Sequence, residues 1–182
     1  MVKYVILFLF IGLARGQDCT ADDGTEGVEL WGECYSIENT TEIYINFGIT
    51  GEIPSSIGSL INLESLSIFN NNLTGSIPTE IGNLTNLNYL SLTNNQLIGS
   101  IPIEISNLTN LTSLRLGFNQ LTGSIPTEIS NLNNLTHLIL EYNEFTDEIP
   151  ESLCDLNIDW SEDSNFKITN NQLCPPYPSC IE

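Results

Sequence analysis

The chain has 182 residues, and 41% of them are hydrophobic, which is enough for one domain with a substantial buried core. Only 4 residues are Lys or Arg, against 23 Asp or Glu, so the formal net charge is −19. Nucleic-acid phosphates and anionic lipid headgroups would repel such a chain, which excludes polyanions as expected partners.

The first 16 residues are predicted to be a signal peptide. Lys3 supplies a short positive region, residues 5–13 form an apolar run, and Ala14-Arg15-Gly16 places small residues where a signal peptidase reads. The run is about half as long as a membrane-spanning helix requires. Two of the four basic residues would leave with this segment, so the mature charge would be 2 − 23 = −21. We therefore expect a secreted or cell-surface protein without a membrane span.

Cysteine usage agrees with export. The five cysteines lie near the two ends of the chain, at Cys19, Cys34, Cys154, Cys174 and Cys180. In an oxidising compartment this placement predicts two disulfide-stapled ends around a middle that needs no bridge, and the odd number leaves one thiol free or shared with a partner. No CxxC pair occurs and the single histidine, His137, is far from either cluster, so no metal site is predicted.

The middle of the chain repeats every 24 residues. The stretch NNLTGSIPTEIGNLTNL at 71–87 returns almost unchanged at 119–135, and the rows share leucine, asparagine, glycine and Ile-Pro columns. A repeat of this length predicts a solenoid, in which each coil buries its apolar face only against its neighbours.

Each column has a physical reason. The Leu-x-Leu spacing has period two, so it predicts a short strand in every coil, and stacked coils would pair these strands into a parallel sheet. An asparagine after the strand can satisfy backbone groups that a buried turn leaves unpaired. Glycine permits the tight backbone there, and proline after isoleucine restricts the far side to extended or short helical-turn structure. The predicted asparagine ladder is Asn71, Asn95, Asn119, Asn143 and Asn171.

These rows resemble the plant-type, 24-residue subclass of extracellular leucine-rich repeat proteins, whose rows read LxxLxxLxLxxNxLxGxIPxxIGxL. The resemblance covers roughly residues 43–173. The first coil is one residue short and lacks the ladder asparagine, Asp147 replaces the glycine of the fifth coil, and the last coil arrives four residues late. Terminal coils must cover the open ends of the core, so irregularity there is expected.

The resemblance implies an α/β solenoid: a right-handed coil with a short-stranded parallel sheet on its concave face, and extended and short helical-turn segments on its convex side. Disulfide-stapled caps close the two ends. The expected divisions are a signal peptide at 1–16, an N-terminal cap at 17–41, about five repeat coils at 42–153, and a C-terminal cap with a final degenerate coil at 154–182.

The resemblance also implies that Cys19–Cys34 is the bridge of the N-terminal cap. At the other end, Pro178 lies one coil after Pro150, which brings Cys180 within disulfide reach of Cys154. We favour Cys154–Cys180, and the pairing of Cys174 with Cys180 stays open.

By resemblance, the function is recognition of a partner on the concave face. The outward positions of the predicted strands differ from coil to coil, as a binding surface would, although solvent-facing positions can also simply drift. The candidate ligand-binding residues are Tyr44, Phe69, Tyr89, Thr93, Arg115, His137, Ile139 and Glu141. The expected partner is a protein or a glycan, and no cofactor is expected.

Other functions fit less well. Some plant-type members bind ice, and the columns Ser76/Ser100/Ser124 and Thr85/Thr109 would form regular ladders, so ice or crystal-surface binding and a structural surface role stay open. A serine nucleophile would need His137 as its base, and nothing marks any serine as activated, so we expect no enzyme. The chain also contains six candidate sequons for N-glycosylation, at Asn39, Asn72, Asn83, Asn107, Asn110 and Asn134.

Overall fold

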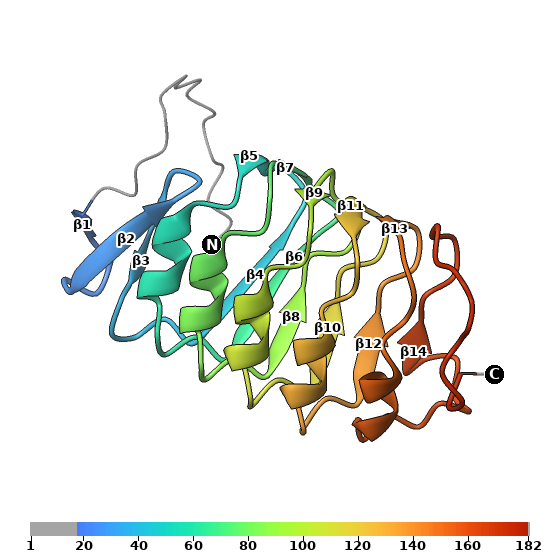
Figure 1. Cartoon of the computed structure of the whole chain (residues 1–182). Coiled ribbons are helices and arrows are strands. Elements are labelled where there is room, and N and C mark those ends of the chain that lie inside the picture. The colour runs from blue at the N-terminus through green and yellow to red at the C-terminus, as the bar shows by residue number, and fades with distance from the viewer. Residues whose placement is uncertain (1–17, 182) are drawn as a thin grey trace.

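The computed structural model describes residues 18–181, so the predicted signal peptide at 1–16 lies outside the described residues. A stack of coils runs from an N-terminal cap to a C-terminal cap, with the strands of the main sheet along one side and short helices along the other (Figure 1). The predicted solenoid is therefore confirmed.

The main sheet lines the concave side. Within residues 18–181 it has six parallel strands in the spatial order β14-β12-β10-β8-β6-β4. They are β4 (Glu42–Asn46), β6 (Ser65–Phe69), β8 (Tyr89–Ser91), β10 (Ser113–Arg115), β12 (His137–Ile139) and β14 (Phe166–Lys167). The register places equivalent leucines side by side, with Leu114 between Leu90 and Leu138. All three are fully buried, as the alternation of side chains along a strand predicts.

The convex side carries one 3₁₀ helix per regular coil. These helices are η1 (Ser55–Ser59), η2 (Thr79–Asn83), η3 (Ile103–Asn107), η4 (Thr127–Asn131) and η5 (Glu151–Asp155). Each follows a proline, whose ring fixes φ near the value that the turn requires; Pro78, for example, has φ −70°. Backbone N–H groups of Ile81 and Leu84 donate three residues back, at 3.1 and 3.2 Å.

Short parallel ladders join the two sides. One pairs β5 (Thr50–Glu52) with β7 (Asn72–Thr74), and another joins β9 (Ile98–Gly99), β11 (Gln120–Gly123) and β13 (Glu144–Phe145). Between the concave and convex sides lies one continuous core made of the repeated leucine and isoleucine columns. Phe145 takes the place of a leucine in the fifth coil and is fully buried.

The predicted ladder of asparagines, which we call the inner asparagine column, links each coil to the one before it. The Oδ1 atom of Asn95 accepts the backbone N–H of Leu73 at 3.0 Å. Its Nδ2 donates to the carbonyls of Ile68 and Leu92, at 2.8 and 3.0 Å. Asn71, Asn119, Asn143 and Asn171 make the same kinds of contact in their coils. The column therefore satisfies buried backbone groups at every step of the stack.

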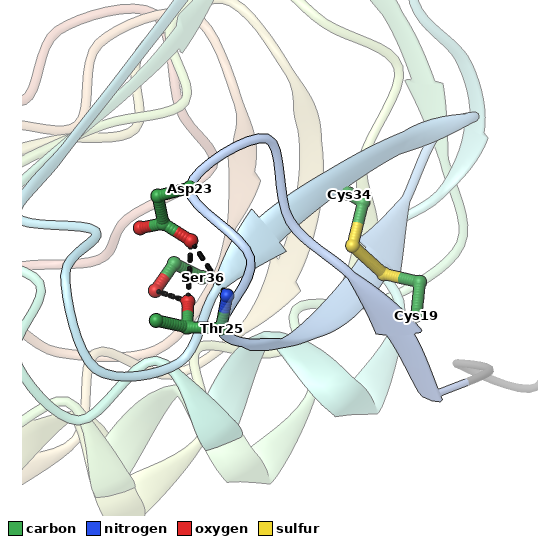
Figure 2. Close-up of a disulfide and its surroundings, with 5 residues drawn as sticks. All are labelled: Cys19, Asp23, Thr25, Cys34 and Ser36. Atoms are coloured by element: carbon green, nitrogen blue, oxygen red, sulfur yellow. Dashed lines mark hydrogen bonds between the residues drawn. A yellow bond between two sulfur atoms is a disulfide. The ribbon is translucent and has the colours of Figure 1, made fainter.

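The N-terminal cap is an antiparallel sheet of β1 (Asp18–Thr20), β2 (Glu26–Leu30) and β3 (Glu33–Ser36). Leu30 is fully buried and extends the core beyond the first coil. A disulfide between Cys19 and Cys34 ties β1 to β3, with a Cα–Cα distance of 6.1 Å (Figure 2). The cap thus covers the apolar end that an uncapped solenoid would expose to water.

Asp23 organises the turn between β1 and β2. Its Oδ1 accepts the hydroxyl and the backbone N–H of Thr25, at 2.6 and 3.0 Å, and the Thr25 hydroxyl lies 2.6 Å from that of Ser36 (Figure 2). Asn39 donates to the other carboxylate oxygen. The hydrogen bonds from Thr25, with a smaller effect from Asn39, lower the pKa of the Asp23 carboxyl to about 2.

The C-terminal cap is held by a disulfide between Cys154 and Cys180, with a Cα–Cα distance of 5.6 Å. This is the favoured one of the two pairings that the sequence left open. Cys174 is exposed and has no disulfide within residues 18–181. Trp160, from the extra segment before the last coil, packs edge-on against Phe166 with ring centroids 4.9 Å apart.

Candidate functional site

Outward side chains form a continuous row across the concave face. The register of the six strands aligns one residue from each, and we call this set the middle row. The middle row is Tyr44, Ser67, Ser91, Arg115, Ile139 and Lys167. Unlike the core columns, it changes its chemistry along the stack, from an aromatic ring through small hydroxyls to cationic side chains.

The N-terminal end of the row is aromatic. Tyr44 is 69% exposed, and its ring meets that of Phe69 edge-on with centroids 5.4 Å apart. Ser67 and Ser91, which follow in the row, are only 5% and 4% exposed. The floor of the concave face is therefore low between its aromatic end and the cationic end.

Tyr89 and Thr93 lie at the middle of the face. Tyr89 is partly buried and aligned between Ser65 and Ser113. Thr93 is also partly buried, and its hydroxyl lies 3.4 Å from the backbone carbonyl oxygen of Arg115. Both of these predicted residues therefore lie between the aromatic end and the cationic end of the face.

The C-terminal end brings together the other predicted residues on neighbouring coils. Arg115 Nε donates to Ser113 Oγ at 3.1 Å, from the same strand. His137 begins the next strand, and its Nδ1 lies 2.9 Å from Thr136 Oγ1. Glu141 follows that strand, and one of its carboxylate oxygens lies 3.6 Å from Lys167 Nζ.

One predicted contact residue is placed differently. Ile139 was expected to be an exposed part of the face, but only 7% of it is accessible. It is aligned between Arg115 and Lys167, and long cationic side chains bury their methylene stems along apolar neighbours. Ile139 therefore forms part of the floor and does not offer an exposed contact.

Lys167 is a residue of the face that sequence reasoning missed. It is aligned with Ile139 in the middle row and its side chain is 43% exposed. The four extra residues before the last coil displaced it from the 24-residue rows. The flanking Phe166 and Ile168 repeat the apolar alternation of the earlier strands and could have located it.

Two stacked aromatic rings stand beside this end. Phe118 and Tyr142, which we call the rim pair, have ring centroids 4.4 Å apart and planes inclined by 17°. They remain 43% and 47% exposed. Both have positive φ, 58° and 54°, a region that bulky side chains seldom adopt. The same position is occupied in three other coils by Asn70, Asn94 and Asn170, which enter that region more readily, and in the first coil by Phe47, with φ 71°.

Comparison with known proteins identifies the family. A model described as a leucine-rich repeat region matches residues 44–158. The chain belongs to the leucine-rich repeat family. A comparison with curated proteins finds no match.

Several solved structures are similar to this leucine-rich repeat chain. The plant peptide hormone receptor RGFR1 in complex with RGF2 is 36% identical, with a TM-score of 0.71 over 78% of this chain. A plant ice-binding protein is 36% identical, with a TM-score of 0.67 over 78% of this chain. The BIR3–SERK2 complex from Arabidopsis thaliana contains a chain that is 34% identical, with a TM-score of 0.63 over 84% of this chain.

The matched lengths differ widely. Our leucine-rich repeat chain spans only 22% of the RGFR1 chain and 46% of the ice-binding protein, but 76% of the chain in the BIR3–SERK2 complex. The similar structures include ectodomains of plant receptor kinases, and the two disulfides are those of an extracytoplasmic protein. Between residues 18 and 181, every helix is too short or too polar to cross a bilayer.

A second asparagine column, which the sequence analysis did not recognise, crosses the outer side of the leucine-rich repeats. We call it the outer asparagine column: Asn62, Asn86, Asn110, Asn134 and Asn157. Each Nδ2 donates to a backbone carbonyl of the preceding coil, as Asn110 does to Thr85 at 2.9 Å. Because Asn110 and Asn134 begin Asn-Leu-Thr sequons, they were interpreted as glycosylation sites and not as hydrogen-bond donors between coils.

The column divides the candidate sequons. All six sequon asparagines are exposed. The amide nitrogens of Asn110 and Asn134 are engaged in the outer column, and that of Asn39 donates to Asp23. Asn83 and Asn107 end helices η2 and η3, and their amides donate to no acceptor in the part of the chain that the structure describes.

The polar ladders on the side of the solenoid are exposed but short. Ser76, Ser100 and Ser124 follow one another on successive coils and are all exposed. Ser100 and Ser124 line a shallow hollow of about 670 Å³, together with Glu128, Glu148 and Glu151. Residues 18–181 contain no cluster of three His, Cys, Asp or Glu side chains that could hold a metal ion.

Proposed function

We propose that the chain binds a peptide segment of a partner protein across its concave face. The middle row carries the proposal, because its chemistry changes from coil to coil while the buried columns repeat. Buried leucines are dictated by packing, whereas the exposed Tyr44 and the cationic Arg115 lie outside the buried core cluster. Aromatic and arginine side chains are the types that most often carry contact energy.

The dimensions of the face suit an extended chain. Six parallel strands are separated by five steps of about 4.8 Å each, or about 24 Å in total. An extended peptide covers this span with about seven residues. The low floor at Ser67 and Ser91 gives such a segment room between the two ends of the face.

Two relatives support this kind of partner. One is a peptide hormone receptor in complex with its peptide, and another is a chain in a complex of two proteins.

Selection from a displayed library of random peptides tests the proposal. Clones retained by the mature protein are re-tested on a concave variant, Tyr89→Ala/Arg115→Ala/His137→Ala, and on a convex control, Thr79→Ala/Glu104→Ala/Thr127→Ala. We expect retention to fall about tenfold or more on the concave variant and to stay unchanged on the control. Thermal unfolding confirms that both variants fold. Equal retention on both variants, or no retained clone, contradicts the proposal.

A glycan partner is tested in the same way, by comparing the mature protein and the concave variant on a glycan array.

Ice binding is a second candidate, favoured by the similarity to a plant ice-binding protein. The exposed column of Ser76, Ser100 and Ser124 would supply the regular surface, but Glu148 stands at the next step, beside the hollow. Thermal hysteresis of the refolded mature protein decides the question, since its absence at high concentration removes this candidate.

A further inference from the structure

The cationic side chains of this acidic protein are gathered in one place. Residues 18–181 contain only two Lys or Arg residues, Arg115 and Lys167, and both lie in the middle row on the concave face. The only histidine, His137, begins the strand between them. All other charged side chains in this part of the chain are acidic, so the cationic side chains of residues 18–181 gather only at this end of the face.

Arg115 has no acidic partner of its own. With 23 acids in the sequence, a nearby carboxylate would be expected, yet none lies within 4.0 Å of its guanidinium among residues 18–181. Its Nε is held by Ser113 Oγ at 3.1 Å, and Ser113 is only 5% exposed. The side chain is therefore fixed from its own strand, while its two terminal nitrogens have no protein acceptor in the described residues.

Lys167 is only partly neutralised. Its Nζ lies 3.6 Å from Glu141, whose side chain is 15% exposed, while the lysine side chain is 43% exposed. The two cations lie two strand steps apart, or about 10 Å between backbones. Alternate residues of an extended peptide are about 7 Å apart on one face, so two acidic residues at alternate positions can reach both cations.

The rim pair adds an apolar surface to the same end. Phe118 directly follows Gly117, and Tyr142 directly follows Glu141, so both rings border the last positions of the concave face. They adopt positive φ and remain about half exposed. Three other coils carry asparagine there and the first coil carries Phe47, so the turn itself does not require an aromatic ring, and the two exposed rings of the rim pair are available for contact with a ligand.

We propose that the Arg115–Lys167 end of the concave face seats the carboxylates of an extended acidic peptide segment, with an apolar side chain of that segment against the rim pair. Arginine forms paired hydrogen bonds with a carboxylate, which fixes its orientation as well as its charge. The overall negative charge disfavours acidic segments elsewhere on the surface, so the seat also determines the register of the peptide. The proposal rests on the proposed peptide-binding function and names the chemistry of the ligand.

The same displayed library of random peptides tests the acidic-peptide proposal through the amino-acid composition of the retained clones. The wild-type mature protein is expected to enrich acidic residues several-fold over the input library, and the enrichment is expected to decline as salt is raised. Arg115→Gln/Lys167→Gln is expected to abolish the acidic enrichment while still retaining peptides. Adding Thr79→Lys and Thr127→Lys on the convex side restores the net charge and should not restore the enrichment.

A second variant tests the rim pair. Phe118→Asn/Tyr142→Asn is expected to melt at the same or a higher temperature, because asparagine suits positive φ, and to lose the enrichment of apolar residues next to the acids. Retained clones without acidic enrichment, or acidic enrichment that survives Arg115→Gln/Lys167→Gln, overturn this inference and leave the proposed function standing. If no clone is retained at all, both fail together.

Discussion

The inner and outer asparagine columns place the same residue type at the same 24-residue spacing, but they contribute differently to stability. In the inner column Asn95 is 8% exposed, accepts one backbone N–H and donates to the carbonyls of Ile68 and Leu92, with a longer contact to that of Thr93. In the outer column Asn110 is exposed and donates to a single carbonyl. Both columns join each coil to the one before it. Water can replace the outer hydrogen bond but not the inner ones. The recurrence of asparagine in a sequence column therefore does not by itself show how much stability that column supplies.

The largest expected effect is the loss of an inner asparagine. Asn95→Ala removes the acceptor of the buried Leu73 N–H and the side-chain donor to the buried Ile68 carbonyl, while the Leu92 carbonyl keeps the hydrogen bond from Asn119 Nδ2. We expect the free energy of unfolding to fall by about 3 kcal/mol. Urea unfolding at neutral pH measures it, with the exposed neighbour Gln96→Ala as the control. A loss below about 1 kcal/mol would mean that the buried groups find other partners.

The matched change in the outer column should be much smaller. Asn110→Ala removes one exposed bond to the Thr85 carbonyl, which water can then solvate. We expect a loss of about 0.5 kcal/mol, measured in the same urea experiment. A loss equal to that of Asn95→Ala would show that the outer column is as important for stability as the inner one.

Glycosylation provides a chemical test of the same difference. When the protein is secreted from a eukaryotic host, we expect glycans on Asn83 and Asn107, whose side-chain amides donate no hydrogen bond within residues 18–181, and little on Asn110 and Asn134, whose amides bridge coils. Peptide mass spectrometry of the secreted fraction measures occupancy. Full occupancy of Asn110 in secreted protein with an unchanged melting temperature would contradict this prediction.

The smallest effect concerns the N-terminal cap, where the Asp23 carboxylate, and not an asparagine amide, holds the turn by hydrogen bonds. Hydrogen bonds from Thr25 lower the pKa of Asp23 to about 2, below its usual 3.8. A lowered pKa stabilises the folded state above pH 4, and that contribution is lost as the pH falls towards 2. Asp23→Asn should therefore melt slightly lower than wild type at pH 5, and the difference should vanish near pH 2. A difference that stays constant with pH would point to lost packing instead.

Much of the fold could be predicted from the sequence, because a solenoid repeats its constraints. The 24-residue period alone assigns Leu90, Leu114 and Leu138 to one buried column. It also assigns the inner asparagines to the turns that follow the strands. The family resemblance added the caps, and Cys19–Cys34 is paired as that resemblance implied.

The candidate site was harder to predict, because it depends on departures from the period. Lys167 was not aligned with the 24-residue rows because four extra residues precede its coil, although the strand register pairs it with Ile139. The burial of Ile139 depends on its long neighbours, which strand alternation does not describe. Asn110 was interpreted only as a sequon, although asparagine recurs every 24 residues at Asn62, Asn86, Asn110 and Asn134, because the sequence does not show that its amide bonds to the preceding coil.

The near-identity of residues 71–87 and 119–135 has a consequence for how the concave face can change in evolution. Recombination between such similar segments adds or removes whole coils in frame, and the core accepts them because each coil packs only on its neighbours. The aromatic end at Tyr44 and the cationic end at Lys167 would then move apart in steps of about 4.8 Å, without any change at either end. The coil is thus a unit of length, and the number of coils sets how long a ligand the face can span.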